Sequence, residues 1–397
     1  MLEGLKVVEL ATYIAGPGAG GVMADWGAEV VKIESPAGDP MRRFFDSLSD
    51  SHEGNPVFEM DNRGKRSIAL DITKPEGREA AARLIAGADV FLTNVRPAAL
   101  KRAGLDYDSL GARYPRLIYC SLTGYGLQGP DADKPGFDVT AFWARSGVAS
   151  LTAPKGIDPF GLRTGVGDHT CSLATVSAIL AAVFERGRTG KGRLVETSLL
   201  RTGVYAIATD MAIQLRLGKI ASTRPREQAV NPLANYFKTA DGHWLCLNPR
   251  DGGADWPDLA RALGQPELAS DPRFAKGRER RTNGAELVRT LDAAFAGLTL
   301  AEAAARLDEA DIVWAPVQTP AECAADPQAQ AAGCFVETPN PKGGTFRAPA
   351  APARFPGADD GPKGPAPALG QHTREVLAGV GYSPAEIERL LAEGAAA

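Results

Sequence analysis

The first half of the chain alternates short apolar runs with helix-forming stretches, and this alternation constrains the fold more than any other feature. Residues 5–10 (LKVVEL) and 29–34 (EVVKIE) have the pattern of buried strands, and a Gly-rich turn and a short helix are predicted between them. Three more strands are predicted at residues 67–71, 89–93 and 117–122. Such alternation predicts an α/β fold whose doubly wound parallel sheet is covered by helices on both faces.

The texture of the sequence changes at about residue 211. A linker is predicted over residues 211–230, followed by a hairpin at 236–247 that turns at Asp241-Gly242. The later segment 339–370 is dense in Pro and Gly, which favours an extended crossing segment or a loop. Capping-box patterns predict helix starts at Thr73, Thr299, Thr319 and Ser383. Because 397 residues exceed the usual size of one hydrophobic core, two or three domains are expected.

Composition and charge argue against several classes of function. The net charge of −4 argues against nucleic acid as the main partner, and the five scattered cysteines lack the spacing of metal ligands. The sequence shows neither a basic leader nor an apolar run of about 18 residues, the length of a membrane span. We therefore expect a soluble, cytoplasmic protein with reduced thiols that binds no metal, nucleic acid or membrane.

Gly167-Asp168-His169-Thr170 stands immediately before a long apolar-periodic stretch, residues 171–186. An acidic residue in the first turn of a helix faces unpaired N–H groups and the positive end of the helix dipole, which keep its carboxylate ionised and able to act as a nucleophile. Asp is also a common helix cap, so position alone leaves both roles open. His169 points about 100 degrees further around the helix, and we expect it to be structural.

Two clusters of basic residues flank predicted strands. Asn62-Arg63-Gly64-Lys65-Arg66 precedes a strand, whereas Asn94-Val95-Arg96-Pro97 follows one and is itself followed by Lys101 and Arg102. In an open α/β sheet the ligand crevice lies beyond the carboxyl ends of the strands, so the second cluster is placed to bind a phosphorylated ligand. A solvated basic face is the alternative interpretation.

A glycine motif in the first turn offers a competing prediction. Residues 16–21 (GPGAGG) fit the G-x-G-x-x-G pattern, and Glu34 stands where a dinucleotide-binding protein carries its ribose-binding acid. Pro17 removes a backbone N–H from the turn, which favours close packing of strand and helix as the role of the glycines. An NAD(P)-dependent oxidoreductase is kept as a distant alternative.

Several motifs occur in order along the chain and resemble those of the class III coenzyme A transferases. This family includes formyl-CoA and carnitine CoA-transferases together with α-methylacyl-CoA racemases. The motifs are ATYIAGP (11–17), GAEVVKIE (27–34), NRGKRS (62–67), GYG (124–126), GD (167–168), RTGKG (188–192), DPQ (326–328) and LGQHT (369–373). The resemblance therefore spans nearly the whole chain.

The resemblance implies roles for particular residues. Asp168 matches the nucleophilic aspartate that attacks an acyl-CoA thioester to form an acyl-aspartyl anhydride; the CoA thiolate then converts it to an aspartyl-CoA thioester, from which the acceptor acid takes the CoA. Asp138 is implied as a second active-site carboxylate or as a helix cap. Coenzyme A, a substrate here, is expected to contact Ile14, Ala15, Asn62, Arg63, Gly64, Lys65, Asn94, Val95, Arg96, Arg102 and Phe137.

Phe137 departs from the racemase pattern. The related racemases carry a histidine at this position, and racemisation requires two acid/base groups on either side of the α-carbon. We therefore predict transfer of CoA from an acyl-CoA to a carboxylic acid. An acyl-CoA racemase or isomerase is the alternative, and a non-catalytic acyl-CoA-binding protein is a more distant one.

Two further departures concern substrate contacts. Ser35 stands where many members carry a basic residue that pairs with a CoA phosphate, and Arg42 or Arg43 is the candidate substitute. Residues 249–256 replace a longer glycine loop, in which Gly252-Gly253 is either a mobile lid or a simple turn.

The resemblance also implies an architecture. Residues 1–210 and 325–397 are expected to form a large CoA-binding, Rossmann-like domain, residues 211–230 a linker, and residues 231–324 a smaller α+β domain. Two chains are expected to interlock as a homodimer that acts on acyl-CoA and small carboxylic acids.

Overall fold

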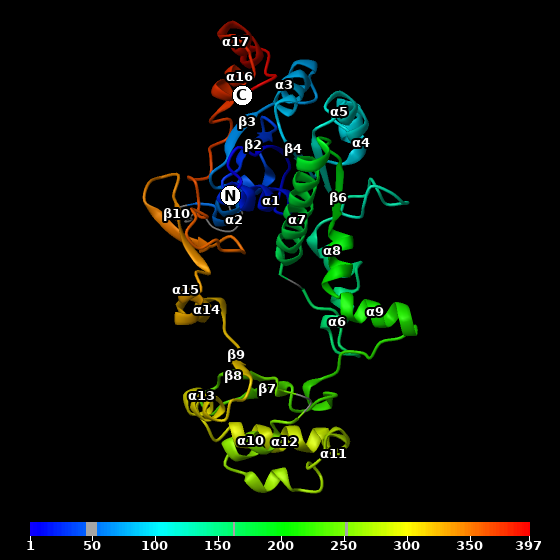
Figure 1. The fold of residues 1–397 in the computed structure, drawn as a ribbon, viewed down its shortest axis with the longest axis vertical. Coiled ribbons are helices and arrows are strands. Elements are labelled where there is room, and N and C mark those ends of the chain that lie inside the picture. The colour runs from blue at the N-terminus through cyan, green and yellow to red at the C-terminus, as the bar shows by residue number, and fades with distance from the viewer. Residues whose placement is uncertain (45–53, 162, 251–252) are drawn as a thin grey trace. The chain divides into compact units, whose positions relative to one another are not determined.

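The computed structural model describes residues 1–44, 54–161, 163–250 and 253–397 of the chain. These residues form two compact units. Unit 1 comprises Met1–Ser150, Phe160–Ile220 and Gln330–Ala397, and unit 2 comprises Leu151–Pro159 and Ala221–Ala329. Both ends of the chain therefore belong to unit 1, as the blue and red ribbons of Figure 1 show.

Unit 1 is built around a six-stranded sheet in the order β3-β2-β1-β4-β5-β6, in which every pairing is parallel (Figure 1). The strands are β1 (Lys6–Leu10), β2 (Glu29–Glu34), β3 (Arg66–Ala69), β4 (Val90–Thr93), β5 (Ile118–Thr123) and β6 (Leu194–Ser198). The predicted α/β fold with a parallel sheet is confirmed, and β6 extends the five predicted strands at one edge.

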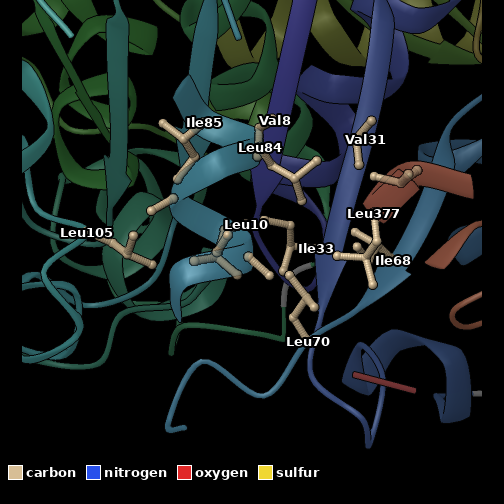
Figure 2. Packing of buried hydrophobic residues seen from close by; sticks show 14 of the residues in the cluster. Val8, Leu10, Val31, Ile33, Ile68, Leu70, Leu84, Ile85, Leu105 and Leu377 are labelled. Atoms are coloured by element: carbon tan, nitrogen blue, oxygen red, sulfur yellow. The ribbon is translucent and has the colours of Figure 1, made fainter. Parts of the chain in front are cut away.

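Helices cover both faces of this sheet. Successive strand residues point to opposite faces, and apolar strand residues on each face pack against helices. On one face, Val8 and Ile33 pack with Leu84 of α3 (Pro75–Ala86) and Leu377 of α16 (Thr373–Gly379) (Figure 2). On the other face, Val7 and its neighbours pack against α1 (Ala15–Asp25) and α7 (Val166–Thr189). The helices α4 (Pro97–Ala103), α5 (Tyr107–Arg113) and α17 (Pro384–Ala392) complete the first face.

Helix α7 is the longest helix of the described residues, with 24 residues. By length and hydropathy it could cross a membrane, but its buried residues pack on the sheet and on α1, as those of a core helix do. After β6 the chain forms α8 (Leu199–Ala206) and α9 (Ala208–Leu217), which ends at Gly218 in the left-handed region (φ 73°). The expected linker over residues 211–230 therefore begins as a helix rather than as extended chain.

The C-terminal segment returns to unit 1. Strands β10 (Phe335–Pro339) and β11 (Thr345–Pro349) pair antiparallel, so the predicted extended segment 339–370 begins within a hairpin. Further along, the N–H of His372 donates to the Ser67 carbonyl at β3, and that of Ala397 donates to the Ala69 carbonyl. Helix α15 (Pro327–Ala331) precedes the hairpin, and α2 (Pro56–Asn62) packs against β11.

Unit 2 is an α+β unit with a small antiparallel sheet in the order β7-β8-β9. The predicted hairpin is confirmed as β7 (Asn235–Lys238) and β8 (Trp244–Leu247), with Gly242 at φ 86° in the turn, and β9 (Trp314–Pro316) pairs with β8. Its core includes Phe237 stacked on Phe295. The helices are α6 (Val148–Thr152, shared with unit 1), α10 (Trp256–Ala262), α11 (Gly277–Thr282), α12 (Gly284–Phe295), α13 (Leu300–Glu309) and α14 (Pro320–Ala325).

Three of the four predicted capping boxes are confirmed, at Thr299, Thr319 and Ser383. The fourth prediction is wrong, because α3 begins after Lys74 and has no side-chain cap. The Thr73 hydroxyl instead donates to Asp71 at 2.6 Å, which holds the turn between β3 and α3.

Candidate active site

Asp168 lies in the first turn of α7. This helix begins directly after Gly165, whose backbone is left-handed (φ 99°). Asp168 is 9% exposed. Burial and the neighbouring charge of Asp138 raise the pKa of the Asp168 carboxyl to about 7, whereas His169 acts in the opposite direction. The sequence predicts a carboxylate held ionised by the helix N-terminus; in the structure the desolvation of this carboxyl opposes that effect, so it titrates near neutral pH.

Asp138 holds the backbone from which α7 starts. Its Oδ2 accepts a hydrogen bond from the N–H of Gly165 at 2.6 Å, and the N–H of Gly167 also faces its carboxylate. A Cβ on Gly167 would lie 2.2 Å from Asp138 Oδ1 and 2.3 Å from the Phe142 ring, so only glycine fits. Asp138 begins the helical turn η2 (Asp138–Ala144), and it links this turn to the helix that carries Asp168.

Asp168 opens into a cavity of about 370 Å³ in unit 1. The cavity lies beyond the carboxyl ends of β1, β4 and β5, the edge at which α/β sheets bind ligands. It brings together six predicted site residues: Ala15, Asn94, Val95, Arg96, Phe137 and Asp168. Its other walls are formed by Thr12, Tyr13, Pro97, Ala99, Leu122, Thr123, Gly124, Ala132, Lys134, Pro135, Gly136 and Leu199.

Asn94 fixes the loop that follows β1. Its Oδ1 accepts a hydrogen bond from the Thr12 N–H at 3.0 Å, and its Nδ2 donates to the Thr12 carbonyl at 2.7 Å. The exposed Arg96 caps α4 beside this contact, and Lys134 supplies a second cation to the cavity wall. Ile14 and Arg102 are among the predicted residues outside the lining of the cavity: Ile14 is buried and packs with Met41 and Phe58, and Arg102 is exposed on α4.

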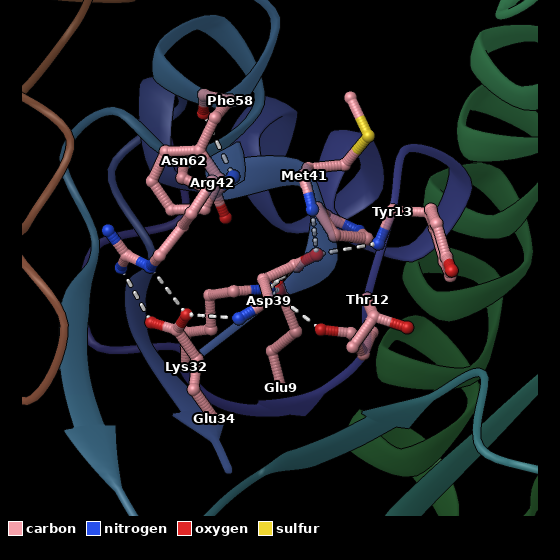
Figure 3. A network of polar contacts seen from close by, with 12 residues as sticks. Glu9, Thr12, Tyr13, Lys32, Glu34, Asp39, Met41, Arg42, Phe58 and Asn62 are labelled. Carbon is pink, nitrogen blue, oxygen red and sulfur yellow. Dashed lines mark hydrogen bonds and ion pairs between the residues drawn. The ribbon is translucent and has the colours of Figure 1, made fainter. Parts of the chain in front are cut away.

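Tyr13 forms an aromatic wall with Phe137, with ring centroids 5.3 Å apart in an edge-to-face arrangement. Tyr13 has a left-handed backbone (φ 65°), which is uncommon for a residue with a side chain. Its N–H donates to Asp39 Oδ1 at 3.1 Å, and Lys32 pairs with the other carboxylate oxygen at 2.9 Å (Figure 3). Buried charges below the loop therefore hold the wall in place.

Lys65 belongs to the same buried network and not to the cavity. Its Nζ donates to Glu9, to the Pro17 carbonyl and to Asn62, at 2.7, 2.8 and 3.0 Å. Asn62 is fully buried, and its Nδ2 donates to the Phe58 carbonyl. Protein groups therefore engage the side chains of Asn62 and Lys65 inside unit 1, away from the cavity, and the expected contact of these residues with CoA stays a prediction.

Arg63 is buried as well. Its guanidinium pairs with Asp25, at 2.6 Å for the shortest contact, and donates to Thr338 and to the Pro349 carbonyl. Gly64 takes a left-handed turn (φ 71°), and its N–H donates to the carbonyls of Gly364 and Pro365. In this structure Arg63 and Gly64 join the C-terminal segment to the rest of unit 1, and their expected contacts with CoA stay a prediction.

The residues that would support dinucleotide binding are also engaged within the fold. Glu34 is buried and forms two hydrogen bonds of 2.7 Å with Arg42, so the Glu34 carboxylate is closed to a ribose, while a contact of Arg42 with a CoA phosphate stays a prediction. The other candidate, Arg43, donates to the Ala37 carbonyl. The glycines of residues 16–21 lie in α1, where Gly18 and Gly21 allow close approach to α7 and α2.

The sequence analysis missed Tyr13 and Lys134. The left-handed position of Tyr13 has no glycine to mark it, and Lys134 stands in a loop without a strand or helix pattern. The predicted lid falls partly on Gly252, which lies outside the described residues. Within residues 1–44, 54–161, 163–250 and 253–397, no cluster of three or more His, Cys, Asp or Glu side chains is arranged to hold a metal ion.

The fold and the cavity define an α/β protein with a titratable carboxylate at a helix N-terminus, in a pocket edged by two cations. Comparison with known proteins shows the family of this chain. The sequence profile of CoA-transferase family III matches residues 2–373. The chain is 34% identical to the (R)-2-hydroxy-4-methylpentanoate CoA-transferase of Clostridioides difficile, over 98% of this chain and 97% of that protein.

Two further relatives are similar over nearly their whole length. The cinnamoyl-CoA:phenyllactate CoA-transferase of Clostridium sporogenes is 34% identical, covering 98% of this chain and 96% of that protein. The crystal structure of a CAIB/BAIF family protein from Brucella suis superposes with a TM-score of 0.83 at 34% identity, covering 96% of this chain and 99% of the other. The chain belongs to CoA-transferase family III, and it is an enzyme that transfers CoA from an acyl-CoA to a carboxylic acid.

Proposed function

We propose that Asp168 is the covalent nucleophile of this transfer. Its carboxylate attacks the thioester carbonyl, and the C–S bond breaks to give an acyl-aspartyl anhydride and the CoA thiolate. The thiolate attacks the aspartyl carbonyl, which releases the donor acid and forms an aspartyl-CoA thioester. The acceptor carboxylate then attacks this thioester, and the thiolate released attacks the acceptor's acyl carbon to give the new acyl-CoA and free Asp168.

One observation carries this proposal: Asp168 is the carboxylate that lines the cavity at the start of a long helix. Its pKa of about 7 leaves a substantial ionised fraction at neutral pH, while its burial limits attack by water on the anhydride and thioester. The N-terminus of α7 supplies the positive end of a helix dipole beside the oxyanion that forms at each carbonyl.

The two cations at the cavity edge support a place for CoA. Arg96 and Lys134 carry the charge needed to bind its phosphates, since guanidinium and ammonium groups donate strongly to phosphate oxygens. Ala15, Val95 and Phe137 line the same cavity and offer apolar surface for the pantetheine arm. The thioester would then reach Asp168 with the acyl group against the wall of Tyr13 and Phe137.

Trapping the intermediate tests the proposed nucleophile. The enzyme is incubated with an acyl-CoA and then with borohydride or hydroxylamine, and the peptide that contains Asp168 is analysed by mass spectrometry. Reduction or hydroxamate formation at Asp168 is expected, and Asp168→Asn is expected to lose turnover and trapping together. Full turnover by Asp168→Asn would refute the proposal.

The cavity supports an apolar acyl group on at least one substrate. Among its lining residues, the cations Arg96 and Lys134 are assigned to CoA, which leaves Tyr13, Leu122, Phe137 and Leu199 as neutral walls. The names of the two CoA-transferases reported above state acids with a branched or aromatic side chain. We expect branched or aromatic monocarboxylates to give higher kcat/KM than dicarboxylates in a screen of acids, and the reverse order would contradict this assignment.

A homodimer is the proposed assembly. Large apolar side chains are exposed on α7, α8 and α9, including Phe184 (70%), Tyr205 (80%) and Leu215 (80%). Exposed apolar surface of this kind is typical of a protein interface. Light scattering is expected to give twice the mass of one chain, and Leu215→Glu is expected to weaken the dimer; a monomeric wild-type enzyme would refute this assembly.

A further inference from the structure

His169 follows Asp168 in α7, and its side chain contacts a different element. Its Nε2 lies 3.1 Å from Oδ1 of Asp61, a residue of α2 that is 3% exposed. The pair lies within van der Waals distance of Gly18 of α1, where an added Cβ would lie 3.4 Å from His169 Cδ2 and 3.5 Å from Asp61 Oδ1. The imidazole is thus held on a buried carboxylate beside the candidate nucleophile.

Both ring nitrogens of His169 face hydrogen-bond acceptors. Nε2 faces the Asp61 carboxylate, and the backbone of Gly165 accepts from the ring as well. A neutral imidazole has one donor and one acceptor nitrogen, whereas the imidazolium has two donors. Burial lowers the pKa of His169, but the hydrogen bond and charge of Asp61, the charge of Asp168 and the backbone of Gly165 together raise it by more, so the net pKa lies above the ordinary value.

A positive charge on His169 opposes the negative charges that surround Asp168. Three groups act on Asp168, and two of them, Asp138 of η2 and Asp61 of α2, are acidic and disfavour its ionisation. The third, His169, favours it. Burial raises the pKa of the adjacent Cys171 thiol to about 11, so this thiol stays neutral at the pH of the reaction.

We propose that His169, held by Asp61, is a positioning residue whose positive charge favours the ionised, nucleophilic form of Asp168. This role rests on the proposed function of Asp168 and adds to it the source of the balancing charge. Asp61 also faces the charges of Lys65 and Glu9, which are paired with each other in the buried network.

The pH profile of kcat/KM distinguishes this role from a purely structural one. Activity rises with pH as Asp168 ionises, so the loss of a neighbouring positive charge moves the rise to higher pH. For His169→Gln we expect a shift of about one pH unit, which is about tenfold in activity below the midpoint and little change at alkaline pH. His169→Arg keeps a positive charge and is expected to restore the wild-type midpoint. His243→Gln, an exposed histidine of unit 2, is the matched control.

An equal loss of activity at every pH in His169→Gln and His169→Arg would overturn the inference. Asp168→Asn is assayed in parallel. If it is inactive while the profile of His169→Gln is unshifted, only the role of His169 fails; if it turns over normally, the nucleophile fails and this inference with it.

A second measurement does not depend on activity. The chain has four histidines, so the Cε1–H resonance of His169 can be assigned by NMR from its disappearance in His169→Arg. We expect it to titrate above the ordinary histidine range in the wild type and at lower pH in Asp61→Asn. An unchanged titration in Asp61→Asn would overturn the inference.

Discussion

Replacement of Asp138 tests whether its carboxylate positions the start of α7 or takes part in proton transfer. In Asp138→Asn the amide carbonyl can still accept the hydrogen bond from Gly165, but the negative charge beside Asp168 is gone. The pKa of Asp168 then falls below about 7, because one of the charges that raise it is removed. We expect the rise of kcat/KM to move to lower pH, so that the variant exceeds the wild type at acidic pH.

The magnitude of the stability change follows from two opposing effects. A hydrogen bond to a charged acceptor is worth roughly 1.5–3 kcal/mol against about 1 for a neutral one, so Asp138→Asn weakens the contact with Gly165. Burial raises the pKa of Asp138, which means that the fold disfavours its charge, and the amide removes that cost. We expect a net change within about 1 kcal/mol for Asp138→Asn and a loss of roughly 2–3 kcal/mol for Asp138→Ala, which leaves the Gly165 N–H without its acceptor.

Two assays test these expectations. Urea unfolding gives the stability change, and a pH series of kcat/KM gives the shift in ionisation. A role in proton transfer predicts instead that Asp138→Asn loses about 100-fold to 10,000-fold in activity at every pH. That result, with an unchanged stability, would refute the positioning role of Asp138.

Three further variants probe other parts of the site. Gly167→Ala drives a methyl group into Asp138 and Phe142, and we expect it to lose most activity and unfold at lower urea; wild-type turnover would contradict the packing described. Arg96→Ala and Lys134→Ala are expected to raise KM for acyl-CoA about tenfold at similar kcat, while Arg113→Ala on α5 serves as the surface control; equal KM values in all three would refute the CoA assignment. Arg63→Met leaves Asp25 buried without its partner, and we expect a loss of roughly 3–5 kcal/mol in stability with an unchanged KM; a raised KM in a stable protein would support Arg63 as a CoA ligand instead.

The parallel sheet was predictable because its signal is local. The run at 29–34 is the strand β2, whose apolar residues are buried on both faces of the sheet: Val30 packs on one face, and Val31 and Ile33 pack in the cluster on the other. Capping boxes are equally local, and three of four were found from residue pairs three positions apart. The segment after residue 208 was missed because α9 has no buried residues, so its helix leaves no apolar period in the sequence.

The burial and the ion-pair partners of the charged residues were not predictable from the sequence. Lys65 and Arg63 stand in a basic run that is typical of a ligand loop, but their partners, Glu9 and Asp25, lie far away in the chain. Only the fold brings these groups together and removes them from solvent. Asp168 was found because a helix start is visible in sequence, whereas its raised pKa depends on Asp138 and on burial, which are not.

Isotope transfer from the acceptor acid tests the covalent role of Asp168 most directly. An acceptor whose carboxylate carries heavy oxygen is turned over with an unlabelled acyl-CoA, and the peptide containing Asp168 is weighed. Attack of the acceptor on an aspartyl-CoA thioester leaves one heavy oxygen on the Asp168 carboxylate, so labelling is predicted only when both substrates are present. An unlabelled Asp168 after many turnovers would contradict the mechanism.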